Sequence, residues 1–246
     1  MFPIIDNIPS RRPPIAVWGI IFANVLIFFA QLGLNDAQLH NLFMMFGVVP
    51  RRLAHPEWAV WVGFPDAGYL TLLTSMFLHG GWGHLLGNMW TLWIFGDNVE
   101  DRMGPIGFLL FYLLCGLVAG IVHVLVNPGS TVPTVGASGA ISGVMAAYLV
   151  LYPTAGVITL VPILFYPLFI TIPAVFYMMI WLATQLFGGA IGLFAPNVGG
   201  IAFWAHIGGF VAGAFLWPWF VRPTRRSRPI MRDEYGMEIG WRRDWL

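Results

Sequence analysis

Gly136-Ala137-Ser138-Gly139 opens an apolar segment of membrane-spanning length, and a later apolar segment carries Ala205-His206-Ile207-Gly208-Gly209. Polar side chains are costly at membrane depth, because each must find a hydrogen-bond partner or face a water-filled cavity. Residues that are kept in spite of such a cost are candidates for function. Ser138 and His206 are therefore the first candidate catalytic residues.

The composition predicts an all-α polytopic membrane protein. The 246 residues are 58% hydrophobic and 9% charged, which leaves too few polar side chains to cover a soluble globule of this size. One crossing takes about 20 residues. We predict six transmembrane helices within one domain, residues 15–221, which leaves no room for a second domain; the spans are residues 15–34, 79–98, 105–126, 138–153, 169–187 and 202–221.

Two short tails flank this domain, residues 1–14 and the basic segment 222–246. The net charge is only +1, but arginines gather in both tails, with Arg11 and Arg12 in the first and seven more in the second. The positive-inside rule then predicts that both termini lie in the cytoplasm, and an even number of six spans agrees with this prediction. As a separate expectation, we take the membrane to be a plasma membrane or a bacterial inner membrane. We interpret the basic tail as a topology anchor beside anionic lipid rather than a nucleic-acid site.

The connections between spans differ in length and composition. The first, residues 35–78, carries the pair Arg51-Arg52, which does not fit the orientation that the positive-inside rule predicts from the tails. Because this connection also holds Trp and Pro residues, we expect it to fold at the membrane interface. Residues 154–168 are apolar but broken by two prolines, and either dip into the membrane or extend a neighbouring helix. Residues 188–200 hold five glycines and one proline, a composition flexible enough for a lid.

Three further polar residues, His79, His84 and Asn88, lie in the predicted second span. His84 and Asn88 are four residues apart, so a helix places them on one face, where both could hydrogen-bond the same chemical group. His79 is about 140° further round the same helix, and we expect it to bond loop backbone instead.

Ser138 begins the predicted fourth helix, where free N–H groups and the helix dipole favour negative charge and so provide an oxyanion site. Two small-xxx-small patterns, Gly139-xxx-Gly143 and Gly209-xxx-Gly213, allow two helices to approach closely. Such an approach would bring the His206 imidazole to the Ser138 hydroxyl. The sequence offers His206 no other partner.

Structural interpretations compete with this one. A lone serine usually bonds its own helix backbone, glycine faces can serve packing alone, and we interpret His123 as structural. Cys115 stands alone, so there is no disulfide framework or cysteine metal cluster. Helix-end and loop pairing accounts for Asp97, Glu100, Asp101 and Arg102. The coincidence of Ser138, His206, His84 and Asn88 favours catalysis, because they supply a nucleophile, a base and two oxyanion donors.

From about Tyr69 to Phe220 the chain resembles the rhomboid intramembrane serine proteases. The shared motifs, in the family's order, are His79-x4-His84-x3-Asn88, Phe95-Gly96-Asp97-Asn98-Val99-Glu100, Gly136-Ala137-Ser138-Gly139 and Ala205-His206-x-Gly208-Gly209. Four motifs in the right order are highly specific.

The resemblance implies a six-helix core with its active site in a water-filled cavity that opens away from the cytoplasm, beneath the loop before the sixth helix. It makes Ser138 the nucleophile and His206 the general base, with His84, Asn88 and the Ser138 N–H in the oxyanion hole. The implied activity is hydrolysis of peptide bonds in or near transmembrane helices of membrane-protein substrates, through an acyl-enzyme and without a cofactor. No acid completes a triad, so we predict a dyad.

Two departures from the family stand out. Many rhomboids carry Trp-Arg in the first loop, where this chain has Leu70-Thr71. Some members place an aromatic residue four positions after the nucleophile, stacked on the catalytic histidine, where this chain has Ser142. We therefore expect helix packing to hold His206.

Three other classes of function compete. A zinc protease could use His79, His84 and His206, but the His-Glu-x-x-His pattern and a core carboxylate base are missing. A transporter or channel would line a path through the membrane, whereas these polar residues cluster in one half of it. A non-catalytic rhomboid-like protein that binds transmembrane helices would lose the serine or the histidine, and both are present here.

Overall fold

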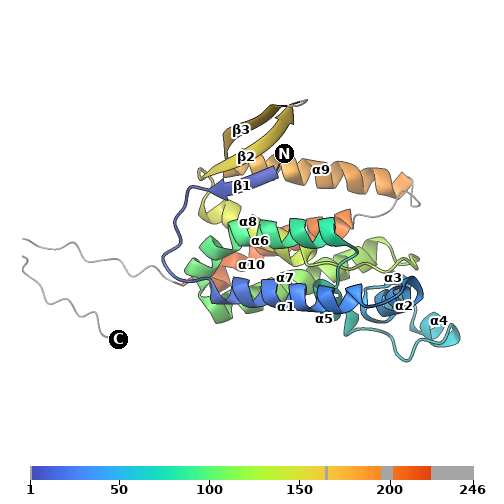
Figure 1. Cartoon of the computed structure of the whole chain (residues 1–246). Coiled ribbons are helices and arrows are strands. Elements are labelled where there is room, and N and C mark those ends of the chain that lie inside the picture. The colour runs from blue at the N-terminus through green and yellow to red at the C-terminus, as the bar shows by residue number, and fades with distance from the viewer. Residues whose placement is uncertain (1, 164–165, 195–201, 223–246) are drawn as a thin grey trace, which may run out of the picture.

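The computed structural model describes residues 2–163, 166–194 and 202–222, and helices dominate this part of the chain (Figure 1). Six long helices correspond to the six predicted segments: α1 (Ile15–Leu32), α6 (Trp82–Met103), α7 (Pro105–Val126), α8 (Ser138–Leu151), α9 (Ala174–Phe194) and α10 (Phe203–Phe220). The bounds of α7 are those predicted for the third span. The basic segment 223–246 lies outside the described residues.

Within the described residues, three helices are long and apolar enough to cross a membrane, namely Ile15–Leu32, Pro105–Val126 and Ala174–Gly192. The shorter apolar helix α8 joins them at the centre of the bundle. These helices establish membrane-protein features, while the count of six crossings stays a prediction.

Helix α8 forms the core of the bundle. Every residue from Gly139 to Tyr148 is buried, and helices α6, α7 and α10 all pack against it. Small residues make this possible, because glycine and alanine let helix backbones come close. The helix that begins at Ser138 is therefore held on all sides.

A small sheet corrects the all-α prediction. Strands β1 (Phe2–Asp6), β2 (Gly156–Ile163) and β3 (Tyr166–Pro173) form an antiparallel sheet in the order β1-β2-β3. It lies at the edge of the bundle, where α9 begins (Figure 1). Prolines disfavour a helix here and face each other in the hairpin as the pair Pro162 and Pro167, while the β-branched residues between them and α9 suit strands.

Three sequence expectations change with the sheet. Residues 154–168 neither extend a helix nor dip as a simple loop, because most of them are strand. The fifth helix begins at Ala174 rather than at residue 169. The N-terminal segment is more than a tail, since Asp6 accepts hydrogen bonds from Tyr148 and from Asn98 and so fixes β1 to the bundle. Burial raises the pKa of the Asp6 carboxyl.

The first connection is ordered, as predicted. It holds α2 (Asp36–Phe46), α3 (Pro50–Ala54), α4 (Pro56–Trp61), α5 (Thr71–Thr74) and the 3-10 turn η1 (Ser75–Phe77). Buried Arg52 links these pieces through bonds to the carbonyls of Met44 and Met45 and an ion pair of 2.8 Å with Asp66. Arg51 lies over the ring of Trp58. Both arginines therefore serve the loop's own fold, and its position at the interface stays a prediction.

Glu100 shows what the acidic cluster at the end of α6 does. Its buried carboxylate accepts the backbone N–H groups of Ala16 and Val17, at 3.0 and 2.9 Å. The start of α1 has no side-chain cap of its own, so Glu100 satisfies groups that would otherwise be costly. The predicted role in helix-end pairing is confirmed for this residue.

Candidate active site

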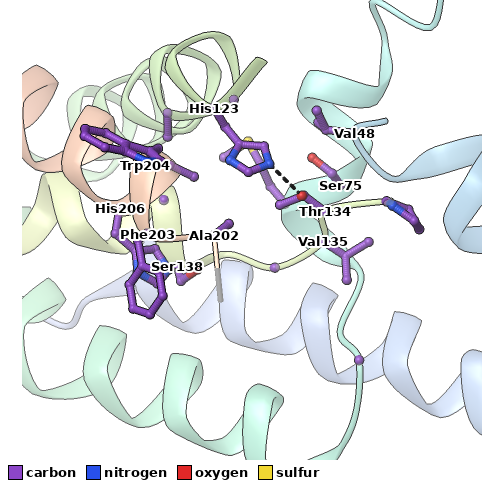
Figure 2. Close-up of a pocket in the computed structure, with 18 of the residues that line it drawn as sticks. Val48, Ser75, His123, Thr134, Val135, Ser138, Ala202, Phe203, Trp204 and His206 are labelled. Atoms are coloured by element: carbon purple, nitrogen blue, oxygen red, sulfur yellow. Dashed lines mark hydrogen bonds between the residues drawn. The ribbon is translucent and has the colours of Figure 1, made fainter. Parts of the chain in front are cut away.

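Ser138 and His206 meet across the contact between α8 and α10. The Ser138 Oγ and the His206 Nε2 are 2.7 Å apart, although 68 positions separate them in the chain. Figure 2 shows both residues on one side of a cavity, with His123 and Thr134 on another. The predicted pair is thus in hydrogen-bond contact.

Glycines bring these two helices together. A side chain at Gly209 would overlap the carbonyl oxygen of Gly139, and one at Gly213 would overlap that of Gly143. The backbones of α8 and α10 therefore touch directly, as the two small-xxx-small patterns predicted. This contact sets the distance between the hydroxyl and the imidazole.

A residue that the sequence analysis missed lies behind the histidine. The Nδ1 of His206 is 2.7 Å from the Oε1 of Gln185, a residue of α9 that is 8% exposed. The indole of Trp181, also from α9, lies with its centroid 6.0 Å from the imidazole. Helix packing around His206 is as expected, but α9 adds a hydrogen bond and an aromatic neighbour that the sequence did not predict. The sequence signal that could have pointed to Gln185 was the presence of an amide side chain in a mostly apolar span.

Ser142, at the position where some relatives carry an aromatic residue, has a local role. Its hydroxyl donates to the carbonyl oxygen of Ser138, one helical turn back. This is the usual behaviour of a serine inside an apolar helix. Trp181 takes the place beside the imidazole from a different helix.

His84 and Asn88 lie next to the segment that leads into Ser138. A Cβ atom on Gly136 would come within 2.5 Å of the His84 Nε2 and 3.6 Å of the Asn88 Nδ2. Gly136 has a φ of +127°, a conformation that favours glycine. The Gly80 N–H points to the Nδ1 of His84 at 3.4 Å, which leaves the Nε2 to carry the proton. Both predicted oxyanion donors therefore flank the approach to the serine.

His79 does not follow its prediction. It precedes α6 instead of lying on it, and it is 1% exposed. Its Nε2 is 2.9 Å from the Asn88 Nδ2, while its backbone N–H and carbonyl bond the side chain of Gln31. His79 thus contacts an oxyanion candidate, a contact that the sequence did not predict. The error arose because the helix was started three residues too early.

His123 lies on the far wall of the cavity and fits the structural interpretation. Its Nε2 is 2.9 Å from the Thr134 Oγ1, as the dashed line in Figure 2 marks, and its Nδ1 is 3.4 Å from the Asn127 amide. These contacts tie α7 to the segment that leads into Ser138. They hold that segment in place beside the dyad.

The dyad and the oxyanion candidates share one cavity of about 790 Å³. Its walls include Ser138, His206, His84 and Asn88, together with the aromatic residues Phe203 and Trp204 at the start of α10. A volume of this order is typical of ligand-binding pockets. The predicted lid, residues 188–200, is part of helix α9 up to Phe194, and residues 195–200 lie outside the described residues.

Two of the three histidines of the zinc alternative bond other groups through their rings. His79 bonds Asn88, and His206 bonds Ser138 and Gln185. In residues 2–163, 166–194 and 202–222, no group of three or more His, Cys, Asp or Glu side chains is arranged to hold a metal ion.

Comparison with known proteins gives a match to the family described as Rhomboid domain over residues 66–223. The chain is 33% identical over 141 residues to Rhomboid-like protein 11, chloroplastic, of Arabidopsis thaliana, which covers 57% of this chain and 44% of that protein. It is 28% identical over 218 residues to RHOMBOID-like protein 12, mitochondrial, of the same plant, which covers 82% of this chain and 57% of that protein.

A bacterial relative carries an activity in its name. Over 78 residues the chain is 42% identical to Rhomboid protease GluP of Bacillus subtilis (strain 168), which covers 32% of this chain and 15% of that protein. The chain spans about half the length of the two plant relatives that it matches.

Proposed function

Because this chain belongs to the rhomboid family, we propose that it is an intramembrane serine endopeptidase that cleaves membrane-protein substrates in or near their transmembrane helices. The observation that carries the proposal is the 2.7 Å contact between the Ser138 Oγ and the His206 Nε2 on the wall of the cavity. The family includes relatives named as proteases, and this chain has both a serine and a histidine in contact.

The chemistry begins with proton transfer. His206 accepts the hydroxyl proton through its Nε2 as the Ser138 oxygen attacks a substrate carbonyl carbon. The tetrahedral intermediate then collapses, and the imidazolium returns the proton to the leaving amine. The first product departs and leaves an ester between the substrate and Ser138. His206 next activates a water molecule that hydrolyses the ester.

Three donors would stabilise the negative oxygen of the intermediate. They are the backbone N–H of Ser138, the Nε2–H of His84 and the amide of Asn88. The first lies at the start of α8, where the helix dipole adds to the stabilisation. The two side chains flank Gly136 on the same wall of the cavity. In comparable hydrolases the loss of one such donor costs about 100- to 1,000-fold in rate.

The substrate must expose a backbone carbonyl before attack. A regular helix hides its carbonyls in intrahelical hydrogen bonds, so the segment that is cleaved has to unwind. Small or helix-breaking residues lower the cost of unwinding. We therefore propose that the substrates are single-span proteins with such residues near one membrane surface. We also propose that this chain, the enzyme, crosses the membrane several times and has both termini in the cytoplasm.

Labelling with a fluorophosphonate, a probe that reacts with activated serines, tests the proposal. We expect the purified protein to be labelled at Ser138 and to cleave a model single-span substrate in liposomes. The Ser138→Ala and His206→Ala variants should lose at least about 1,000-fold of the activity while retaining the thermal unfolding temperature of the wild type. A chelator should leave the activity unchanged.

Other results would contradict the proposal. Full cleavage by Ser138→Ala would rule out the serine mechanism, and labelling at another residue would rule out the assignment. A wild-type protein that binds the substrate helix but is neither labelled nor active would favour the non-catalytic, helix-binding alternative.

A further inference from the structure

We propose that Gln185 is a positioning residue for the general base: its amide oxygen accepts the Nδ1–H of His206 and so keeps the Nε2 lone pair directed at Ser138. The inference rests on the proposed serine-protease function and adds to it a residue from α9. Its basis is the 2.7 Å contact between the Gln185 Oε1 and the His206 Nδ1.

The chemistry of imidazole requires such an acceptor. A neutral histidine carries a proton on only one ring nitrogen, and the other nitrogen accepts. The base must accept at Nε2, so its proton has to lie on Nδ1. In a buried site an N–H without an acceptor is costly, and without one the ring would favour the inactive tautomer or rotate. The Gln185 Oε1, in contact with the His206 Nδ1, is that acceptor.

An amide can present either its oxygen or its nitrogen, and the neighbours on α9 decide which one faces His206. The Gln185 Nε2 donates to the Thr184 Oγ1 at 3.0 Å. That hydroxyl in turn donates to the carbonyl oxygen of Trp181 at 2.6 Å. With its nitrogen used on its own helix, Gln185 turns its oxygen to the imidazole.

These bonds form one directional chain across three helices. Ser138 donates to the His206 Nε2, the His206 Nδ1 donates to Gln185, Gln185 donates to Thr184, and Thr184 donates to the backbone of α9. The Gln185 Nε2 also reaches the carbonyl oxygen of Trp181, at 3.5 Å, and that helix carbonyl ends the chain. An amide at the position of the acid in a triad orients the ring without placing a charge in an apolar bundle.

Variants of Gln185 separate positioning from packing. Gln185→Met keeps the length of the side chain but removes the acceptor, so we expect kcat to fall by about 100-fold with KM within about twofold of the wild type. Gln185→Glu restores an acceptor oxygen and should keep kcat within about tenfold of the wild type. Leu186→Met, an exposed change on the same turn of α9, is the matched control and should leave both constants unchanged.

The experiment measures kcat, KM and the rate of fluorophosphonate labelling for all four proteins in liposomes, with thermal unfolding as a check on folding. Equal losses in Gln185→Met and Gln185→Glu would overturn the inference, because they would indicate a packing role. So would a Gln185→Met protein with wild-type kcat and labelling. Failure of the wild type itself to be labelled would overturn the proposed function, and this inference with it.

Discussion

The two sides of His206 are held in opposite ways. On the Nε2 side, α8 and α10 meet through glycines, and their backbones touch because side chains are absent. On the Nδ1 side, α9 reaches the ring with two side chains, Gln185 and Trp181. The first contact fixes a distance between helices, and the second fixes the orientation of a ring. Any side chain at the contacting glycines would push the two backbones apart, whereas the side chains of α9 can be replaced by others of similar size.

The largest effect is expected where the backbones touch. Gly209→Ala would place a methyl group onto the carbonyl oxygen of Gly139, so α8 and α10 must move apart. Overpacking of this kind costs about 3 kcal/mol or more in folding free energy, and a displacement of about 1 Å at the dyad costs about 100-fold in rate. Thermal unfolding and cleavage assays should both show the loss. A fully active Gly209→Ala protein would show that the glycine contact does not set the dyad distance.

A smaller effect is expected on the α9 side. Trp181→Leu removes the indole beside the imidazole but leaves the Gln185 hydrogen bond in place. Loss of such an aromatic contact costs about 1 kcal/mol, so we expect kcat to fall by about fivefold to tenfold. Kinetic assays of Trp181→Leu and Trp181→Phe check this, and Phe should recover most of the rate. A loss as large as that of Gly209→Ala would contradict the contrast between the two sides.

The smallest effect tests whether α9 is helical where a lid was predicted. Among the residues that the structure describes, a Cβ atom on Gly192 would meet no atom within 4 Å. Because alanine is the better helix former, Gly192→Ala should stabilise α9 by up to about 1 kcal/mol and leave cleavage unchanged. Thermal unfolding measures the change in stability of Gly192→Ala, and the cleavage assay measures its activity. A marked fall in activity would mean that this glycine is needed as a hinge after all.

The sequence motifs predicted the contact between Ser138 and His206 because much of what brings it about can be read from local patterns. Gly139 and Gly209 are small at helical spacing, and that spacing alone predicts a close contact between two helices. His84 and Asn88 are four apart, so their shared face follows from helix geometry. The positions of Ser138 and His206 in their helices then followed.

The partners of His206 and the small sheet could not be predicted in the same way. Gln185 meets His206 only through the packing of α9 on α10, and the sequence motifs do not indicate which side chains that packing brings together. The strands β2 and β3 are apolar, so their composition does not distinguish them from helix. The pairing of β2 with β1 joins residues about 150 positions apart. His79 was misplaced for a simpler reason, since helix starts are uncertain without a capping signal.

The length of α8 has a consequence for how water reaches the serine. This helix has 14 residues, so it extends for about 21 Å, whereas the hydrocarbon core of a bilayer is about 30 Å thick. If its C-terminal end reaches one face of the bilayer, Ser138 stops several ångströms short of the other. Hydrolysis at that depth needs a supply of water that lipid cannot give. In the proposed mechanism, the cavity beside Ser138 would therefore supply the water for hydrolysis as well as hold the substrate.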